Sequence, residues 1–276
     1  MSAMLYLVPT PIGNLSDISE RCREVLAQAD FIAAEDTRVT LRLLNHLELK
    51  KSLVSYHEHN KAESGSKILV RLLAGETCAL VTDAGSPAIS DPGEDLVRLC
   101  AENGVTVCAI PGPCALVTAL SISGLPTGRF TFEGFLSVNK KSRQEHLTGL
   151  KDETRTMIFY EAPHKLLATL RDLTAAFGED RRISLCRELT KLHEEVLRGT
   201  LGELIQLYEQ TDPRGEYVIV LEGASPEEPE EMSIEQAAEL ARGYAEGGMK
   251  LSEACKTAAQ AAGVSRKELY KLLSGE

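Results

Sequence analysis

The chain has no tryptophan, and only 5% of its 276 residues are aromatic. Proteins that hold single-stranded nucleic acid without sequence preference stack the bases on aromatic side chains, and this composition gives no sign of such a surface. The seven cysteines are scattered singly, without a Cys-x-x-Cys pair. An odd, unpatterned set of this kind is typical of a reducing compartment rather than of a disulfide framework, so we expect a cytoplasmic protein.

Long apolar runs and excess positive charge are lacking too. No apolar stretch approaches the roughly 18 residues that span a membrane, and the N-terminal MSAMLYLVPTP has neither a basic region nor a cleavage site. We therefore expect no membrane segment and no signal peptide. Lys and Arg number 30 against 41 Asp and Glu, a formal net charge of -11. This balance disfavours broad nucleic-acid binding through phosphate contacts but is compatible with a local basic patch.

The common nucleotide fingerprints are missing as well. The sequence contains neither G-x-G-x-x-G nor G-x-x-x-x-G-K-[ST], which disfavours a Rossmann dinucleotide enzyme and a P-loop NTPase. No spaced set of Cys and His indicates zinc. His57 and His59 could lie on one side of a strand end, but we interpret them as a surface loop or a substrate contact and expect no metal.

The chain has instead a repeated pattern, in which a short apolar run ends in a turn rich in proline and glycine. The pattern occurs at residues 5–14, 79–93 and 105–115. Turns of small residues let a ligand approach the backbone closely, and the carboxyl ends of parallel strands form the binding edge of an open α/β sheet. We expect the three turns to build one site at this edge, although ordinary strand-to-helix connections also produce such turns.

Strand and helix patterns alternate along the chain, which predicts an α/β fold. We expect two α/β domains, residues 1–124 and 125–224, the first built on a mostly parallel sheet covered on both faces. Residues 225–232, rich in Glu and Pro, predict an acidic hinge. A helical extension over residues 233–276 resembles a helix-turn-helix, and a nucleic-acid role and a plain appendage are equally consistent with it.

The individual elements follow from the same patterns. The expected strands are residues 5–8, 31–34, 53–56, 78–81, 105–110, 130–135, 156–160, 183–186 and 217–221. The expected helices are residues 18–29, 61–73, 94–101, 114–123, 144–150, 164–177, 201–210, 234–245 and 251–262, with a last one from Arg266. Residues 137–143, SVNKKSR, are expected to form a basic loop.

Charged side chains follow two of the expected strands. Glu35, Asp36 and Arg38 come directly after the strand at 31–34. Two carboxylates and a guanidinium can orient a hydroxyl or hold a phosphate, whereas the alternative is that Asp36 caps a helix. Both interpretations stay open at this point. Tyr160 and Glu161 end a strand of the second domain, and we expect them to face the first domain across a cleft.

Seven motifs occur in the order PTPIGNL, AAEDTR, TDAGSPAISDPG, PGPCA, FEGFL, FYEAPHKL and RELTK. Together they resemble the ribosomal RNA small-subunit methyltransferase I family over about residues 5–222. The resemblance implies transfer of a methyl group from S-adenosylmethionine to the ribose 2′-hydroxyl of a cytidine in 16S ribosomal RNA. It also implies the tetrapyrrole-methylase fold, with the cofactor in a cleft between two α/β domains and a helical C-terminal extension.

The resemblance further implies a set of cofactor contacts. Ser86 stands where many relatives have aspartate, so an ionic contact to the amino group of the cofactor is not expected from that position. The implied cofactor-binding residues are Pro11, Ile12, Gly13, Ala84, Gly85, Ser86, Ile89, Cys114, Ala115, Tyr160, Glu161, Leu189 and Glu216, the last with its strand neighbour Tyr217.

A ribose hydroxyl is a weak nucleophile, and a proton acceptor accelerates such reactions by about 10²–10⁴-fold. We expect Asp36 or Glu35 to take or orient the proton, and Arg38 and His57 to hold the adjacent phosphate or ribose. Asp83 and Asp91 are interpreted as residues that shape their loop. The candidates for RNA docking are Lys140, Lys141, Arg143, Arg266, Lys267 and Lys271.

The acidic net charge predicts weak binding of naked RNA, so the assembled 30S subunit is the expected substrate. The fold group implies a homodimer. Two other functions are consistent with parts of the sequence: methylation of a small tetrapyrrole, and a non-catalytic RNA-binding or ribosome-assembly role for the C-terminal helices.

Overall fold

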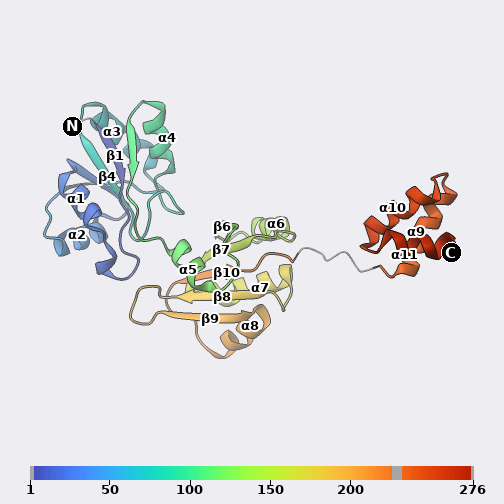
Figure 1. Cartoon of the computed structure of the whole chain (residues 1–276). Helices are drawn as coiled ribbons and strands as arrows, with labels where there is room; N and C mark the ends of the chain where they lie inside the picture. The colour runs from blue at the N-terminus through green and yellow to red at the C-terminus, as the bar shows by residue number, and fades with distance from the viewer. Residues whose placement is uncertain (1–2, 226–231, 275–276) are drawn as a thin grey trace. The chain divides into compact units, whose positions relative to one another are not determined.

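The structure is a computed structural model that describes residues 3–225 and 232–274. The chain divides into two compact units, Met1–Gly223 and Ala224–Glu276, each described by itself below. The larger unit contains two five-stranded sheets, with the orders β3-β2-β4-β1-β5 and β6-β7-β10-β8-β9 (Figure 1). In the described residues no helix is long and apolar enough to cross a membrane.

The first sheet is parallel throughout and is covered on both faces. On β2, Phe31 and Ala33 pack beneath α3 and α4, whereas Ile32 and Ala34 pack beneath α1 and α2. This alternation buries both faces of the sheet, as expected from the sequence. The elements are β1 (Met4–Leu7), α1 (Glu20–Gln28), β2 (Phe31–Ala34), α2 (Thr37–His46), β3 (Ser52–Ser55), α3 (Lys61–Leu73), β4 (Thr77–Val81), α4 (Glu94–Glu102) and β5 (Thr106–Ala109).

The second sheet is mixed. β6 and β7 are parallel, and the other neighbouring pairs are antiparallel. Helices α6, α7 and α8 cover one face, and α5 covers the other. The elements are α5 (Ala115–Ser123), β6 (Phe130–Phe135), α6 (Lys140–Gly149), β7 (Thr156–Glu161), α7 (Leu166–Phe177), β8 (Arg182–Arg187), β9 (Glu195–Thr200), α8 (Leu201–Gln210) and β10 (Tyr217–Leu221).

Helix α5 belongs by its packing to the second sheet. Its side chains Leu116 and Leu120 share a core with Ile158 and Val218. The sequence grouping placed this helix in the first domain, because it continues the strand-helix alternation before residue 125. Its apolar face, rather than its place in the alternation, decides where it packs.

The structure corrects one local expectation and adds two elements that were not predicted. The expected loop at residues 137–143 is wrong from Lys140 onward, because Asn139 accepts hydrogen bonds from the backbone N–H groups of Lys141 and Ser142 and so begins α6 at Lys140. Helix α2 was not predicted as an element, although a capping role for Asp36 was considered. Strand β9 was not predicted either; it is an edge strand that pairs with β8 alone.

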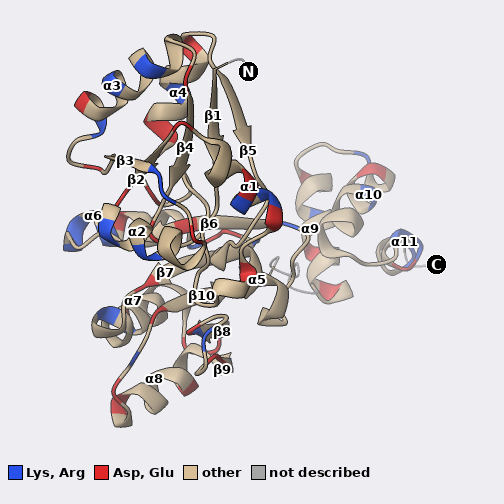
Figure 2. Cartoon of the chain, turned by 90° about the vertical axis from the view of Figure 1, so that its left-hand side faces the viewer, with Lys and Arg blue, Asp and Glu red and all other residues tan. Residues whose placement is uncertain are grey.

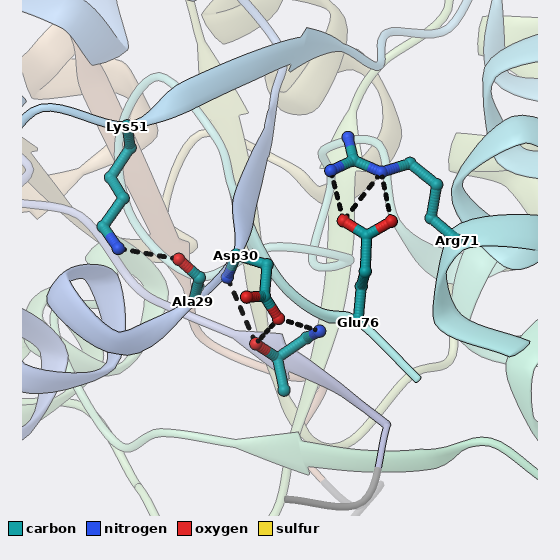
Figure 3. A network of polar contacts seen from close by, with 6 residues as sticks. Ala29, Asp30, Lys51, Arg71 and Glu76 are labelled. Carbon is teal, nitrogen blue, oxygen red and sulfur yellow. Dashed lines mark hydrogen bonds and ion pairs between the residues drawn. The ribbon is translucent and has the colours of Figure 1, made fainter. Parts of the chain in front are cut away.

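A polar network closes the amino-terminal edge of the first sheet (Figure 3). The Asp30 carboxylate accepts hydrogen bonds from both the backbone N–H and the hydroxyl of Thr77, each 2.7 Å long. The Lys51 ammonium donates to the carbonyl that follows α1, at 2.8 Å, and the Arg71 guanidinium pairs with Glu76. These contacts join the starts of β2, β3 and β4, so this edge of the sheet is structural.

The smaller unit is a bundle of three helices, α9 (Ile234–Glu246), α10 (Leu251–Ala262) and α11 (Arg266–Ser274). Its core consists mostly of alanine side chains with Cys255 and Leu269. Gly263, at φ 68°, ends α10 in the left-handed conformation and allows the short turn into α11. Most of the expected acidic hinge, residues 226–231, lies outside the described residues.

Candidate cofactor and substrate cavity

The three turns predicted to share a site meet at the carboxyl edge of the first sheet. Thr10 and Gly85 exchange two backbone hydrogen bonds of 2.9 and 3.0 Å. The Ser86 hydroxyl donates to the carbonyl of Pro113 at 3.0 Å. The first turn is thus tied to the second, and the second to the third, so the edge behaves as one rigid wall.

A cavity of about 440 Å³ lies between this wall and the second sheet. Its volume is within the range of small-molecule sites, about 300–1,000 Å³. It is lined by Ile12, Glu35, Asp83, Ala84, Gly85, Ser86, Ile89, Ser90, Asp91, Cys114, Ala115, Phe135, Tyr160, Glu161, Ala162, Pro163, Cys186, Leu189, Lys191, Glu216, Tyr217 and Val218.

The structure brings together the predicted cofactor contacts, of which all but Pro11 and Gly13 line the cavity. Gly13 lies where the two walls touch. A Cβ atom at this position would be 2.5 Å from Cγ of Lys191 and 2.8 Å from the carbonyl oxygen of Leu189. Glycine is therefore needed at this close approach. Pro11 lies in a separate small hollow beside Asp83.

Tyr160 fixes the wall on the side of the second sheet. Its hydroxyl accepts a hydrogen bond of 3.1 Å from the backbone N–H of Leu116, in the first turn of α5, where an N–H has no partner within the helix. Its ring meets Phe132 and Phe135 edge to face, with ring centres 4.9 and 5.6 Å apart. Phe135 is 58% exposed and lines the cavity.

Glu161 is almost fully buried, and its carboxylate is satisfied by the protein. It accepts hydrogen bonds from the backbone N–H of Ala162, at 2.9 Å, and from the hydroxyl of Thr169, at 2.5 Å. Thr169 in turn accepts a 2.8 Å bond from Arg143, whose guanidinium also pairs with Asp172. The Arg143 side chain is only 12% exposed. Its predicted role in RNA docking is therefore corrected: it supports Glu161 from within the protein.

Three carboxyl groups gather at one end of the cavity, on Glu35, Asp83 and Asp91. The backbone N–H of Asp83 donates to Glu35 at 3.4 Å, and that of Asp36 donates to Asp83 at 3.1 Å. Burial raises the pKa of Glu35 and of Asp83. Burial, followed by the charges of Glu35 and Asp83, raises the pKa of Asp91 to about 7. This end of the cavity favours a positively charged ligand.

The other predicted catalytic residues lie outside the cavity lining. Asp36 caps α2 and binds Arg38 through the backbone N–H, at 2.8 Å, and through the guanidinium. These bonds hold the pKa of Asp36 well below its usual range. Arg38 is exposed, and the ring of His57 lies 6.0 Å from that of His59. Of the four, only Glu35 reaches the cavity.

Several residues of the lining were not predicted. Lys191 bridges Glu188 and Glu216 with two ion pairs of 2.9 Å, and only the folded chain brings these side chains together. Phe135 lies within the motif FEGFL, but the motif did not indicate that this side chain lines the cavity. In the described residues no three His, Cys, Asp or Glu side chains are arranged to hold a metal ion. The unpredicted lining residues are Asp83, Ser90, Asp91, Phe135, Ala162, Pro163, Cys186, Lys191 and Val218.

Comparison with known proteins agrees with this geometry. Residues 4–205 match the family model of the Tetrapyrrole (Corrin/Porphyrin) Methylases. A Ribosomal RNA small subunit methyltransferase I from Synechocystis sp. is 46% identical over 269 residues, which cover 98% of this chain and 96% of that protein. The protein of the same name from Escherichia coli O157:H7 is 45% identical, over 97% of this chain and 93% of that protein.

The chain belongs to the ribosomal RNA small subunit methyltransferase I family. A solved structure with the same fold is that of uroporphyrin-III C-methyl transferase from Thermus thermophilus, complexed with S-adenyl homocysteine. It has a TM-score of 0.56 and 17% identity, and the match covers 79% of this chain and 97% of that one. The family, the fold and the methyltransferase class predicted from the motifs are confirmed.

Proposed function

We propose that the chain transfers the methyl group of S-adenosylmethionine to the 2′-hydroxyl of a cytidine in small-subunit (16S) ribosomal RNA. The cavity is the observation that carries the proposal. It lies at the carboxyl edge of a parallel sheet, where α/β folds bind ligands, and it belongs to a chain whose relatives are named for ribosomal RNA methylation.

The residues of the cavity fit S-adenosylmethionine. Gly85 lines the cavity with φ 87°, a conformation that favours glycine, and without a side chain its backbone can be approached closely by a ligand. Ile12 and Leu189 supply apolar walls for an adenosine group. The carboxyl groups of Glu35 and Asp91 suit a ligand that carries a positive sulfur.

The bound cofactor supplies a methyl group on a positively charged sulfur. Transfer requires the ribose oxygen, the methyl carbon and the sulfur in line, and holding them so can lower the barrier by roughly 7–11 kcal/mol. The chain provides the rigidity: Thr10 and Gly85 fix one wall, and the bond from Leu116 to Tyr160 fixes the other. Gly13, which has no side chain, lets the two walls approach each other closely.

We assign Glu35 to orient the 2′-hydroxyl, since its carboxyl lines the cavity and its pKa is raised by burial. Arg38 is assigned to hold the adjacent phosphate. Its side chain is 85% exposed, and although Nε and one terminal nitrogen bind Asp36, the guanidinium has further N–H donors for a phosphate. His57 is assigned as the second contact to the phosphate or ribose. It lies close enough to Glu35 to oppose, in part, the rise in the pKa of Glu35 that burial causes.

The RNA docks through exposed basic side chains. Lys140 and Lys141 lie in the first turn of α6, and both are exposed (Figure 2). Arg266, Lys267 and Lys271 are exposed on α11 of the smaller unit. With a net charge of -11, the chain gains little from phosphate contacts in general. We propose that the substrate is the assembled 30S subunit, whose shape provides additional contacts.

Phe135 is proposed to stack on the target base. It is among the exposed large apolar side chains and lies in the cavity lining, held edge to face against Tyr160. Enzymes that modify a nucleotide within structured RNA take its base out of the stack, and an aromatic ring replaces the lost neighbour.

We further propose that the chain acts in the cytoplasm as a homodimer, as the singly placed cysteines and the fold group suggest. Sedimentation of the purified chain tests the dimer: a sedimentation coefficient that corresponds to 30.0 kDa, independent of concentration, contradicts it.

Mass spectrometry of nucleosides from 16S ribosomal RNA of a deletion strain tests the function. The expected result is loss of one 2′-O-methylcytidine, restored by the wild-type gene. An unchanged set of ribose methyl groups would overturn the proposal. A parallel change in cellular tetrapyrroles would identify the substrate as a macrocycle instead.

A further inference from the structure

Helix α5 connects the first sheet to the second, and its first turn is part of the cavity wall. Cys114, its N-cap residue, and Ala115, its first residue, both line the cavity. From there the helix runs against the second sheet and ends at Ser123 (green in Figure 1). Its nine residues, at a rise of about 1.5 Å each, put its two ends about 12 Å apart. A residue that fixes α5 along its axis therefore also fixes this part of the wall.

Apolar packing holds α5 against the sheet but by itself defines its axial position only weakly. Most residues of the helix, ALVTALSIS, are apolar, and Leu116, Ala119 and Leu120 share a core with the sheet. The free energy gained by burying such side chains has no preferred direction. Hydrogen bonds have preferred distances and angles. The hydrogen bonds between α5 and the sheet therefore determine where along its axis the helix rests.

Side chains of the second sheet bind the backbone of α5 at both of its ends. In the first turn, the Tyr160 hydroxyl accepts a hydrogen bond of 3.1 Å from the N–H of Leu116. In the last turn, the guanidinium of Arg198 on β9 donates to the carbonyl of Ser123, at 3.0 Å from Nε, and to that of Ile122. One contact is made beside the cavity and the other at the far end of the helix.

Arg198 serves as the C-terminal cap of α5. Gly124 ends the helix in the left-handed conformation, at φ 80°. Among the described residues, only Arg198 donates to the carbonyls of Ile122 and Ser123. A guanidinium suits this position, because its planar fork reaches two carbonyls and its charge complements the negative end of the helix dipole. Without it, these carbonyls would lose their link to the sheet.

We propose that Arg198 is a positioning residue for the cofactor, which fixes α5 along its axis and so holds Cys114 and Ala115 in the cavity wall. The inference rests on the proposed function only through the binding of S-adenosylmethionine. Arg198 lies outside the cavity lining and acts through the helix. The bonds to Tyr160 and to Arg198 constrain one rigid body from its two ends, so the loss of either lets the helix shift.

Calorimetric titration with S-adenosylmethionine tests this role, at a temperature at which circular dichroism shows every variant to be folded. Arg198→Ala should raise the dissociation constant by about 5- to 30-fold. Arg198→Lys keeps the charge but not the fork, and it should recover part of the affinity. Arg182→Ala is the matched control, because Arg182 is an exposed arginine on the same face of the sheet that pairs with Glu222 instead of α5. It should bind the cofactor as the wild type does.

The two ends of α5 also provide a test of the mechanism. Tyr160→Phe keeps the ring but removes the hydroxyl that binds Leu116. Independent changes at separated sites multiply their effects on a dissociation constant. If both bonds position one helix, the double variant with Arg198→Ala should raise the dissociation constant by clearly less than the product of the two single changes. Hydrogen exchange gives a structural measurement: in Arg198→Ala the Leu116 amide, at the other end of the helix, should exchange faster than in the wild type.

The outcomes separate this inference from the proposed function. A dissociation constant for Arg198→Ala within threefold of the wild type overturns the role of Arg198, and so does an equal loss of affinity in Arg182→Ala. Effects of the two single changes that simply multiply, or a Leu116 amide that exchanges at the wild-type rate, also overturn it. A wild type that binds S-adenosylmethionine but methylates no RNA overturns the proposed function alone. A wild type that does not bind the cofactor overturns both.

Discussion

Gly13 is the point at which the two walls of the cavity touch, and Gly13→Ala tests whether that contact is needed. The added methyl group would lie 2.5 Å from Cγ of Lys191, 2.7 Å from the hydroxyl of Thr190 and 2.8 Å from the carbonyl oxygen of Leu189. The lysine side chain can move aside, but a backbone carbonyl moves only with its loop. The two walls must therefore separate.

Overpacking of this kind destabilises the closed arrangement by about 1–3 kcal/mol. If the cofactor binds only the closed arrangement, its affinity should fall by about 5- to 150-fold. Because each sheet has its own apolar core, the thermal unfolding temperature should change little. Calorimetric titration with S-adenosylmethionine, together with a thermal melt, measures both quantities.

Gly128→Ala is the matched control, because a Cβ there would meet no atom within 4 Å. It should bind the cofactor as the wild type does. A dissociation constant for Gly13→Ala within threefold of the wild type would refute the reasoning, as would an equal loss in Gly128→Ala.

Three further predictions concern stability and RNA. Thr169→Val removes a donor from the buried Glu161 carboxylate and should lower the free energy of unfolding by about 1–3 kcal/mol in urea titration; an unchanged urea midpoint contradicts this. Hydrogen bonds from Thr77 lower the pKa of Asp30 in the folded protein below the ordinary value of 3.8. The ionised Asp30 carboxylate therefore contributes its full stabilisation at pH values above 3.8, and this contribution is lost as the pH falls through the pKa of the folded state. Asp30→Asn should therefore be less stable than the wild type at neutral pH, and the difference should shrink in acid; a constant difference in urea midpoint opposes the assignment. Phe135→Ala should raise KM for 30S subunits by about 5- to 150-fold, with a much smaller effect on cofactor affinity, whereas Phe135→Tyr should retain most of the wild-type KM; equal KM values argue against stacking.

Local sequence signals predict much of the fold. The strand at Phe31–Ala34 and the helix at Lys61–Leu73 were predicted with their observed bounds, because an apolar run marks the strand and Gly75 marks the end of the helix. The loop expected at residues 137–143 was wrong, since its basic character hid the capping side chain of Asn139. Strand β9 was missed because pairing with β8 defines it.

The same distinction holds for the candidate site. The turns rich in proline and glycine predicted the cavity wall, because these residue types restrict or extend the backbone conformations that a turn can adopt. A helix cap by Asp36 was one of two interpretations that the sequence left open, but the place of Asp91 in the cavity was not visible. Asp36 and Asp91 are both aspartates beside turns, yet Asp36 is bound to Arg38 while Asp91 faces Glu35, which lies far from it in sequence. The helix cap is a local feature of the chain, whereas long-range packing brings Asp91 close to Glu35.

The central claim is methyl transfer from S-adenosylmethionine to a ribose of small-subunit ribosomal RNA. The most direct test incubates the purified chain with methyl-labelled S-adenosylmethionine and 30S subunits from a strain that lacks the gene, followed by nucleoside analysis. We expect one labelled 2′-O-methylcytidine per subunit. Label on a base, or no label in RNA while the chain binds the cofactor, would contradict the claim.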